Sequence, residues 1–328
     1  MRPQAGSVRV SSVWVFTLAL LLFILFADQL SGAFAAHPAL AEAATVFSGI
    51  FVQAIPFVAL GVLVSALIAA FLPGDDLRKL LPAGRRARVL AAGLAGVGLP
   101  ACECASAPIA SRMLDSGVGR GAAIAFLLSA PAINPVVIAA TFVAFPDRPQ
   151  MALCRFAASL LVAWLVGLVF AKSSAEREPP PNAAHPHEVA GSWSDRFLAA
   201  AQADLLSSGS FLVAGAAFAA IAHVALPPSW LAALGASLVP AIAAMAVFAV
   251  VLSVCSEADA FVAASFTTMP STAQLVFLVV SPMVDLKLVA MHVGMFGTKF
   301  TARLDAVVLA IAVLMAAAAG LLVFGGGR

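Results

Sequence analysis

Long apolar stretches dominate this sequence, and they decide what kind of fold the chain can form. A helix needs about 20 consecutive apolar residues to cross a bilayer. Hydrophobic residues make up 62% of the 328 residues and charged residues only 10%, so the chain lacks the polar surface that a water-soluble fold of this length requires. The sequence therefore predicts an all-α polytopic membrane protein. Its apolar stretches cover residues 11–30, 44–72, 89–113, 121–145, 151–171, 197–226, 230–269, 272–296 and 306–324.

Charge and cysteine usage argue against several other classes of protein. A net charge of +2 is too small to indicate a nucleic-acid partner. The four cysteines are irregularly spaced and do not resemble the disulfide framework of a small secreted domain. The phosphate-binding motif Gly-x-x-x-x-Gly-Lys-Ser/Thr does not occur in the sequence, so the chain has no ATPase site of this type. We expect no cofactor and no enzymatic activity.

Residues 1–43 are expected to form a first transmembrane helix followed by an external loop. Arg2 and Arg9 precede the first apolar run, and small residues follow it at 31–36. This is also the pattern of a secretory signal peptide with its cleavage site. A retained helix is the expectation, and a cleaved signal peptide is the alternative.

The rest of the chain is predicted to form two similar transmembrane repeats, 44–171 and 197–328, joined by a polar cytoplasmic linker at 172–196. Distinctive residues recur in the same order and at nearly constant separation. A shared apolar composition is the simpler alternative to an internal duplication. The corresponding segments are Cys102-Glu103-Cys104 with Cys255-Ser256-Glu257, Phe126 with Phe277, Pro131 with Pro282, and Asn134 with Asp285.

Basic residues orient the two repeats, because Lys and Arg concentrate in cytoplasmic loops. If residues 89–113 and the matching region ending near Met269 are re-entrant hairpins, only Arg148, Arg155 and Arg328 lie outside the cell. Each repeat then has an odd number of full spans and the second is inverted relative to the first, an architecture of secondary transporters. Nine plain spans are the alternative, so we expect about seven to nine.

The first predicted helix break contains thiols and a carboxylate. Pro100 and Pro108 flank Cys102-Glu103-Cys104, and a third thiol, Cys255, lies at the matching break of the second repeat. Buried cysteines often only pack as small hydrophobes. In a helix break, however, thiolates suit soft ions such as Cu(I), Zn²⁺ or trivalent arsenic. We therefore predict that these three cysteines bind a soft metal or metalloid substrate.

The other predicted breaks carry polar and charged side chains. Pro131 and Pro135 flank Asn134, and prolines remove backbone donors, so Asn134 is a candidate substrate contact. In the second repeat, Pro282 precedes Asp285 and Lys287.

Ionisable groups at membrane depth usually mark an ion route. Glu103, Glu257, Asp259, Asp285 and Lys287 are accordingly the candidate ion-coupling residues. Asp285 and Lys287 could instead only neutralise each other. Glu257 and Asp259 have no cation nearby in the sequence, so one of them is expected to carry a proton.

Together these motifs resemble the predicted-permease family that contains the ArsP-type organoarsenical exporters, over roughly residues 45–325. The resemblance implies export of trivalent arsenicals, with Cys102, Cys104 and Cys255 as ligands. Glu103 departs from the family, where a small residue such as serine is more common. The matching segments are Pro100-Ala101-Cys102-Glu103-Cys104, Ala130-Pro131-Ala132-Ile133-Asn134-Pro135, Cys255-Ser256-Glu257-Ala258-Asp259 and Pro282-Met283-Val284-Asp285-Leu286-Lys287.

The predicted function is a secondary-active, multi-pass permease of the inner (plasma) membrane. It would export a soft, thiol-reactive substrate, a trivalent (organo)arsenical in the first instance, by ion-coupled alternating access. The expected partners are the lipid bilayer, that substrate and a proton or other coupling ion, with a homodimer as an option. The alternatives are a permease for another soft metal ion or a small sulfur compound, and a membrane thiol–disulfide electron-transfer protein.

Overall fold

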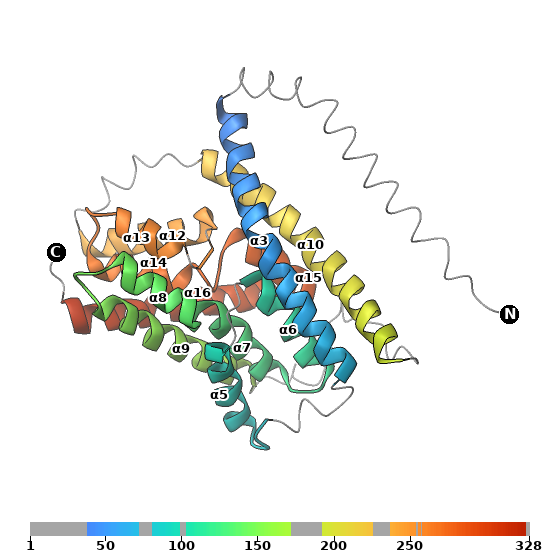
Figure 1. The fold of residues 1–328 in the computed structure, drawn as a ribbon. Helices are drawn as coiled ribbons and strands as arrows, with labels where there is room; N and C mark the ends of the chain where they lie inside the picture. The colour runs from blue at the N-terminus through green and yellow to red at the C-terminus, as the bar shows by residue number, and fades with distance from the viewer. Residues whose placement is uncertain are drawn as a thin grey trace.

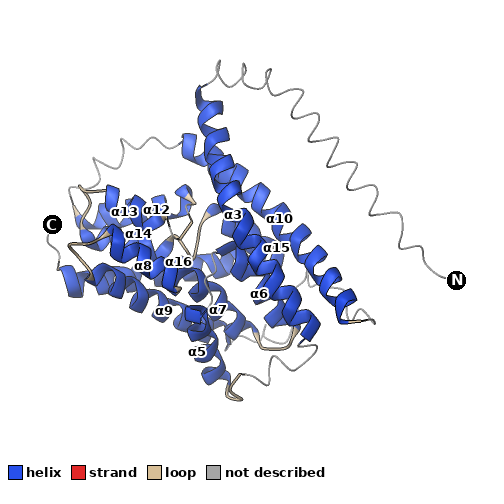
Figure 2. Ribbon diagram, viewed as in Figure 1, coloured by secondary structure: helices blue, strands red, loops and turns tan. Residues whose placement is uncertain are grey.

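The computed structural model describes residues 38–71, 81–98, 103–171, 192–225, 237–253, 255–256 and 258–325. These residues form α-helices joined by short loops, with no strand among them (Figure 2). The helices are α3 (Pro38–Phe71), α5 (Arg85–Ala95), the 3-10 turn η1 (Gly96–Gly98), α6 (Glu103–Asp115), α7 (Arg120–Ile133), α8 (Pro135–Ala144), α9 (Gln150–Ala171), α10 (Trp193–Ala225), α12 (Leu238–Leu252), α13 (Asp259–Ser265), α14 (Ser271–Val280), α15 (Leu286–Phe296) and α16 (Thr298–Phe324).

Helix length and composition confirm the all-α polytopic membrane class. Within the described residues, three helical segments are long and apolar enough to cross a membrane: Arg120–Ala144, Gln150–Ala171 and Thr298–Phe324. Shorter apolar helices accompany them, including Leu238–Leu252 and Leu286–Phe296. Large apolar side chains such as Leu314 and Leu322 of α16 are exposed, as expected on a lipid-facing surface. The first predicted helix and residues 172–191 of the predicted linker lie outside the described residues. The last residues of that linker, 193–196, form the start of α10 instead.

Element order repeats between the two halves of the chain (Figure 1). The order α3, α5, α6, α7, α8, α9 is followed by α10, α12, α13, α14, α15, α16, so each α-helix that the structure describes in the first half has a counterpart in the second. In both halves a break precedes the third helix, which is α6 in the first half and α13 in the second. A second break separates α7 from α8 and α14 from α15. The structure therefore shows the same succession of elements twice, as the sequence motifs predict.

Counterpart helices pack against each other in antiparallel directions. In the α3–α10 pair, Phe71 stacks on Trp193, at the end of one helix and the start of the other, and Ser65 contacts Asp204 further along. In the α9–α16 pair, Phe170 near the end of α9 contacts Phe300 near the start of α16. Antiparallel packing of equivalent helices is the arrangement that inverted repeats produce.

The predicted helix breaks are present, although two prolines act differently from expectation. α7 ends at Ile133 and α8 begins at Pro135, while α14 ends at Val280 and α15 begins at Leu286. Pro135 occupies the first turn of α8, where its missing N–H costs little. Pro108 and Pro131, however, lie inside α6 and α7 and do not end them. A proline within a helix can disturb the preceding turn while the helix continues.

Close approach of α3 and α6 depends on a glycine. A Cβ atom at Gly61 would lie 2.5 Å from the Ala105 Cα and 2.6 Å from the Ala105 carbonyl oxygen, both backbone atoms. Gly49, on the same helix, has no heavy atom within 4 Å of its Cβ position. The α3–α6 contact therefore tolerates no side chain at residue 61.

We predict that Gly61→Ala destabilises the protein by about 1–3 kcal/mol, the usual cost of overpacking. Gly49→Ala is the matched control and should be neutral or stabilising, because alanine favours a helix by up to about 1 kcal/mol over glycine. Thermal unfolding of the two purified variants in the same detergent measures the difference. Equal melting temperatures for both variants would mean that α3 and α6 are not in close contact.

Candidate functional site

The two halves meet where their matching breaks come together. Glu103, the first residue of α6, accepts a hydrogen bond at Oε1 from the Ser256 hydroxyl, 2.6 Å away. Both side chains are fully buried. Glu103 and Ser256 are the residues that correspond in the two sequence repeats. Equivalent residues of two repeats touch only near the axis that relates the repeats, so this contact places the breaks at the centre of the molecule.

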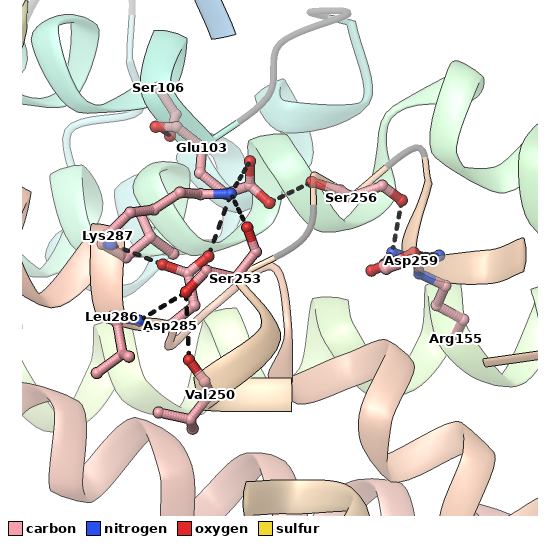
Figure 3. A network of polar contacts seen from close by, with 11 residues as sticks. Glu103, Ser106, Arg155, Val250, Ser253, Ser256, Asp259, Asp285, Leu286 and Lys287 are labelled. Carbon is pink, nitrogen blue, oxygen red and sulfur yellow. Dashed lines mark hydrogen bonds and ion pairs between the residues drawn. The ribbon is translucent and has the colours of Figure 1, made fainter. Parts of the chain in front are cut away.

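A buried lysine lies beside this contact and faces two acids (Figure 3). Lys287 Nζ lies 3.2 Å from Asp285 Oδ2 and 3.8 Å from Glu103 Oε2. It also donates to the Ser253 carbonyl oxygen at 3.2 Å. All three ionisable side chains are fully buried. We call Glu103, Asp285 and Lys287 the central charge cluster. The contact between Asp285 and Lys287 that the alternative interpretation required is present, and Glu103 is an additional acid in contact with the same ammonium.

Local backbone geometry explains how Asp285 and Lys287 reach this position. The Asp285 carboxylate caps α15, accepting from the Leu288 N–H at 2.7 Å. This is a common role for aspartate before a helix. At the end of α12, Ser253 adopts a left-handed conformation with φ of 47°, which is uncommon outside glycine. The chain thereby turns its Ser253 carbonyl toward Lys287.

Asp259 has a cationic partner, contrary to the sequence-based expectation. Arg155 of α9 donates to both carboxylate oxygens of Asp259, each at 2.8 Å. It also donates to the Thr141 hydroxyl at 2.9 Å and to the Ser256 carbonyl oxygen at 3.2 Å. Arg155 and Asp259 are fully buried, so Arg155 lies in the interior of the protein rather than in an exposed loop. The pair joins the first half to the second, as Figure 3 shows beside Ser256.

Asn134 plays the same structural part in the first half as Asp285 plays in the second. Its side-chain oxygen accepts from the Val137 N–H at 2.9 Å and thus caps α8. Its amide nitrogen donates to the Ala130 carbonyl oxygen at 3.2 Å. Asn134 is fully buried. A role in substrate binding stays a prediction.

The thiols expected to bind substrate are only partly described by the structure. Cys255 is buried, at 2% exposure, and directly precedes Ser256 in the chain. Cys104 follows Glu103 in the first turn of α6. Pro100, Cys102 and the Glu257 acid lie outside the described residues. The Glu103–Ser256 contact nevertheless brings together the two chain segments that carry the three predicted ligands.

Three residues of the site escaped the sequence reasoning: Arg155, Ser253 and Ser256. Arg155 is a lone cation near the start of an apolar helix, and Asp259 is an acid without a nearby cation in the sequence. Two such unmatched opposite charges in separate apolar segments could have predicted their pairing, because unpaired charges are costly at membrane depth. No sequence signal identified Ser253, whereas the repeat placed Ser256 at the position equivalent to Glu103.

Comparison with known proteins identifies relatives over most of the chain. A family model described as a predicted permease matches residues 39–321. The protein YcgR of Bacillus subtilis (strain 168) is 35% identical over 262 residues, which cover 78% of this chain and 89% of YcgR. A Streptococcus mutans serotype c protein is 34% identical over 262 residues, covering 78% of this chain and 87% of that protein. Its name describes it as a candidate subunit of a two-component membrane permease complex.

A shorter match is found to the protein YraQ of Escherichia coli (strain K12). It is 30% identical over 113 residues, which cover 34% of this chain and 32% of YraQ. No solved structure matches the chain significantly.

Proposed function

Because this chain belongs to the predicted-permease family whose model matches residues 39–321, we propose that it transports a soft, thiol-reactive substrate, a trivalent (organo)arsenical, out of the cell. The proposal includes a multi-pass location in the inner (plasma) membrane, with the repeats at 44–171 and 197–328 inverted about the central contact. The observation that supports this proposal is the Glu103–Ser256 contact, which joins the two helix breaks. Cys102 and Cys104 flank Glu103 in the sequence, and Cys255 precedes Ser256.

The thiols provide the chemistry for reversible binding. Trivalent arsenic is soft and prefers sulfur ligands over oxygen, by the same argument that assigns soft metals to cysteine. Each cysteine that binds exchanges its S–H bond and an As–OH bond for an As–S bond and one water molecule. Reversal of the same exchange on the other side of the membrane releases the substrate. Cys102 and Cys104 from the first half and Cys255 from the second supply the ligands in this proposal.

Coupling to an ion gradient is assigned to the central charge cluster and its neighbours. Two acids and one lysine leave one excess negative charge in a fully buried region, and such a charge is costly without a counter-ion. Protonation of an acid in this region removes the excess charge. Glu103, Asp285 and Glu257 are the proposed carriers. Asp259 is proposed to be structural, because both of its carboxylate oxygens are bonded to Arg155.

Substrate identity can be tested by resistance measurements in a metalloid-sensitive bacterial host. We expect expression of this chain to protect against trivalent arsenicals and to have little effect on arsenate, which is a hard oxyanion. Protection against Cu(I) or Ag(I) alone would assign the same thiol site to another soft ion. Sensitivity equal to that of the empty-vector host across the whole panel, with the protein present in the membrane, would contradict the proposal.

The relative from Streptococcus mutans suggests that a partner should be included in this experiment. Its name refers to a two-component membrane permease complex, so we propose that this chain also functions with a second subunit or as a homodimer. Co-expression of the neighbouring genes from the source genome should then raise the resistance above that given by the chain alone. Purification under mild detergent, followed by mass measurement of the intact complex, distinguishes a second subunit from a homodimer.

A further inference from the structure

A further buried acid, outside the central charge cluster, links three helices. Asp204 lies about a third of the way along α10 and is 2% exposed. Its Oδ2 atom accepts from the Ser65 hydroxyl of α3 at 2.6 Å and lies 3.4 Å from Arg112 Nη2 of α6. Ser65 also donates to the Pro108 carbonyl oxygen of α6 at 3.3 Å. One carboxylate thus holds the α3–α10 pair against α6.

The geometry points to a gate: we propose that the Arg112–Asp204 ion pair, with Ser65, closes the cytoplasmic side of the permease and opens when α6 moves away from the α3–α10 pair. This inference rests on the proposed transport function. It assigns a role to Arg112, Asp204 and Ser65, none of which takes part in the central charge cluster.

Two ion pairs of arginine with aspartate, Arg112–Asp204 and Arg155–Asp259, differ in how easily they can separate. Arg155 and Asp259 make two contacts of 2.8 Å and are fully buried, so their separation exposes a charge to a dry interior. Arg112 and Asp204 lie 3.4 Å apart, and the Arg112 side chain is 13% exposed. Because the Arg112 side chain is partly exposed, water can solvate its guanidinium as this pair opens. The Arg112–Asp204 pair is therefore suited to break and reform in every cycle.

Helix α6 connects this ion pair to the proposed binding site. It begins at Glu103 in the central contact and carries Arg112 nine residues later, about 14 Å along the helix. Pro108 lies between the two, at a point where a helix loses a backbone hydrogen bond and bends easily. The basic-residue distribution places the Arg112 end on the cytoplasmic side. Movement of that end uncovers a path toward the first turn of α6, where Cys104 is located.

The corresponding position in the first half supports a distinct role for Asp204. α3 and α10 are antiparallel counterparts, and Ile50 lies about as far from the start of α3 as Asp204 lies from the start of α10. Ile50 is apolar and packs against Ala216 of α10. The α3–α10 pair thus has a polar contact, Ser65–Asp204, toward one end and an apolar contact, Ile50–Ala216, toward the other. An ion pair at one end and an apolar contact at the other suit two gates that open at different stages.

Thiol accessibility tests the gate without requiring any substrate. Inside-out membrane vesicles containing the full-length protein are treated with a membrane-impermeant maleimide, and mass spectrometry follows modification of the peptide that contains Cys102 and Cys104. We expect Asp204→Asn and Arg112→Gln each to raise the modification rate about fivefold or more, the change that corresponds to about 1 kcal/mol less stability of the closed state. The double variant should be modified no faster than either single variant, because each single change already removes the same Arg112–Asp204 ion pair.

A matched control and a cross-link complete the test. Asp195→Asn makes the same change at the exposed start of α10, where Asp195 accepts only a local bond from the Ser192 N–H, and should leave the rate unchanged. Arg112→Cys combined with Asp204→Cys, oxidised to a disulfide or bridged by a short bifunctional reagent, should reduce modification below the wild-type level until the bridge is cleaved.

Unchanged modification rates in the asparagine and glutamine variants, or in the cross-linked protein, would overturn the gate. Additive effects in the double variant would also overturn it, because they would indicate general loosening of the fold. These outcomes are separate from those of the resistance panel. If the protein gives no arsenical resistance but the variants still change thiol accessibility as expected, the proposed substrate is wrong and the gate is still supported.

Discussion

Asp259→Asn is expected to destabilise the protein by about 3–5 kcal/mol, the cost of leaving a buried charge without its partner. In the wild-type protein Arg155 donates to both Asp259 oxygens and is fully buried. The asparagine variant keeps a single acceptor and removes the negative charge. The remaining contacts of Arg155, to the Thr141 hydroxyl and the Ser256 carbonyl oxygen, are neutral and compensate only in part.

Thermal unfolding in a fixed detergent measures this effect, and a double-mutant cycle isolates its cause. Arg155→Gln should be about as destabilising as Asp259→Asn, whereas the double variant should be more stable than either, because it contains no unpaired charge. Melting temperatures of the single variants equal to that of the wild type would show that Arg155 is solvated rather than dependent on Asp259.

Cys102→Ser and Cys104→Ser are expected to weaken binding of a trivalent arsenical by more than about 100-fold. Changes to residues that only support a metal ligand already cost about 10–100-fold in affinity, and here the ligand atom itself is replaced. A serine hydroxyl is a hard, neutral ligand that suits a soft centre poorly. Calorimetric titration of the purified protein with arsenous acid, whose three hydroxyl groups can exchange with three thiols, measures the affinity.

The fourth cysteine provides a matched control for this experiment. Cys154 is buried in α9 among apolar neighbours and is not part of the proposed site, so Cys154→Ser should bind with nearly wild-type affinity. Cys255→Ser is expected to behave like the Cys102 and Cys104 variants, because its chain segment contacts Glu103 through Ser256. Equal affinities for Cys102→Ser, Cys104→Ser and wild type would remove these thiols from the binding site.

The membrane class and the helix breaks could be predicted from local sequence. Apolar stretches longer than a bilayer core exclude a soluble fold, and Asn134 and Asp285 each follow a proline by three residues within such a stretch. Both are helix N-caps in the structure. Capping is a local interaction, so a single sequence contains the information that predicts it.

The pairing of charges could not be predicted in the same way. Arg155 and Asp259 are 104 residues apart in the chain, and Glu103 and Ser256 are 153 apart. Such contacts depend on how the two halves are inverted and packed, and on the left-handed turn at Ser253 that directs a carbonyl toward Lys287. The sequence repeat did place Glu103 and Ser256 at equivalent positions, and two equivalent residues near a two-fold axis are expected to be neighbours.

Uptake into inside-out membrane vesicles tests the central claim, that this chain exports a soft thiol-reactive substrate by ion-coupled transport, most directly. The vesicle interior is acidified, and accumulation of methylarsonous acid is followed over time in vesicles with and without the protein. We expect accumulation above the equilibrium level, its loss when an ionophore dissipates the pH gradient, and its absence in the Cys102→Ser variant. Arsenical levels in protein-containing vesicles that stay equal to those in empty vesicles, with or without the gradient, would contradict the account.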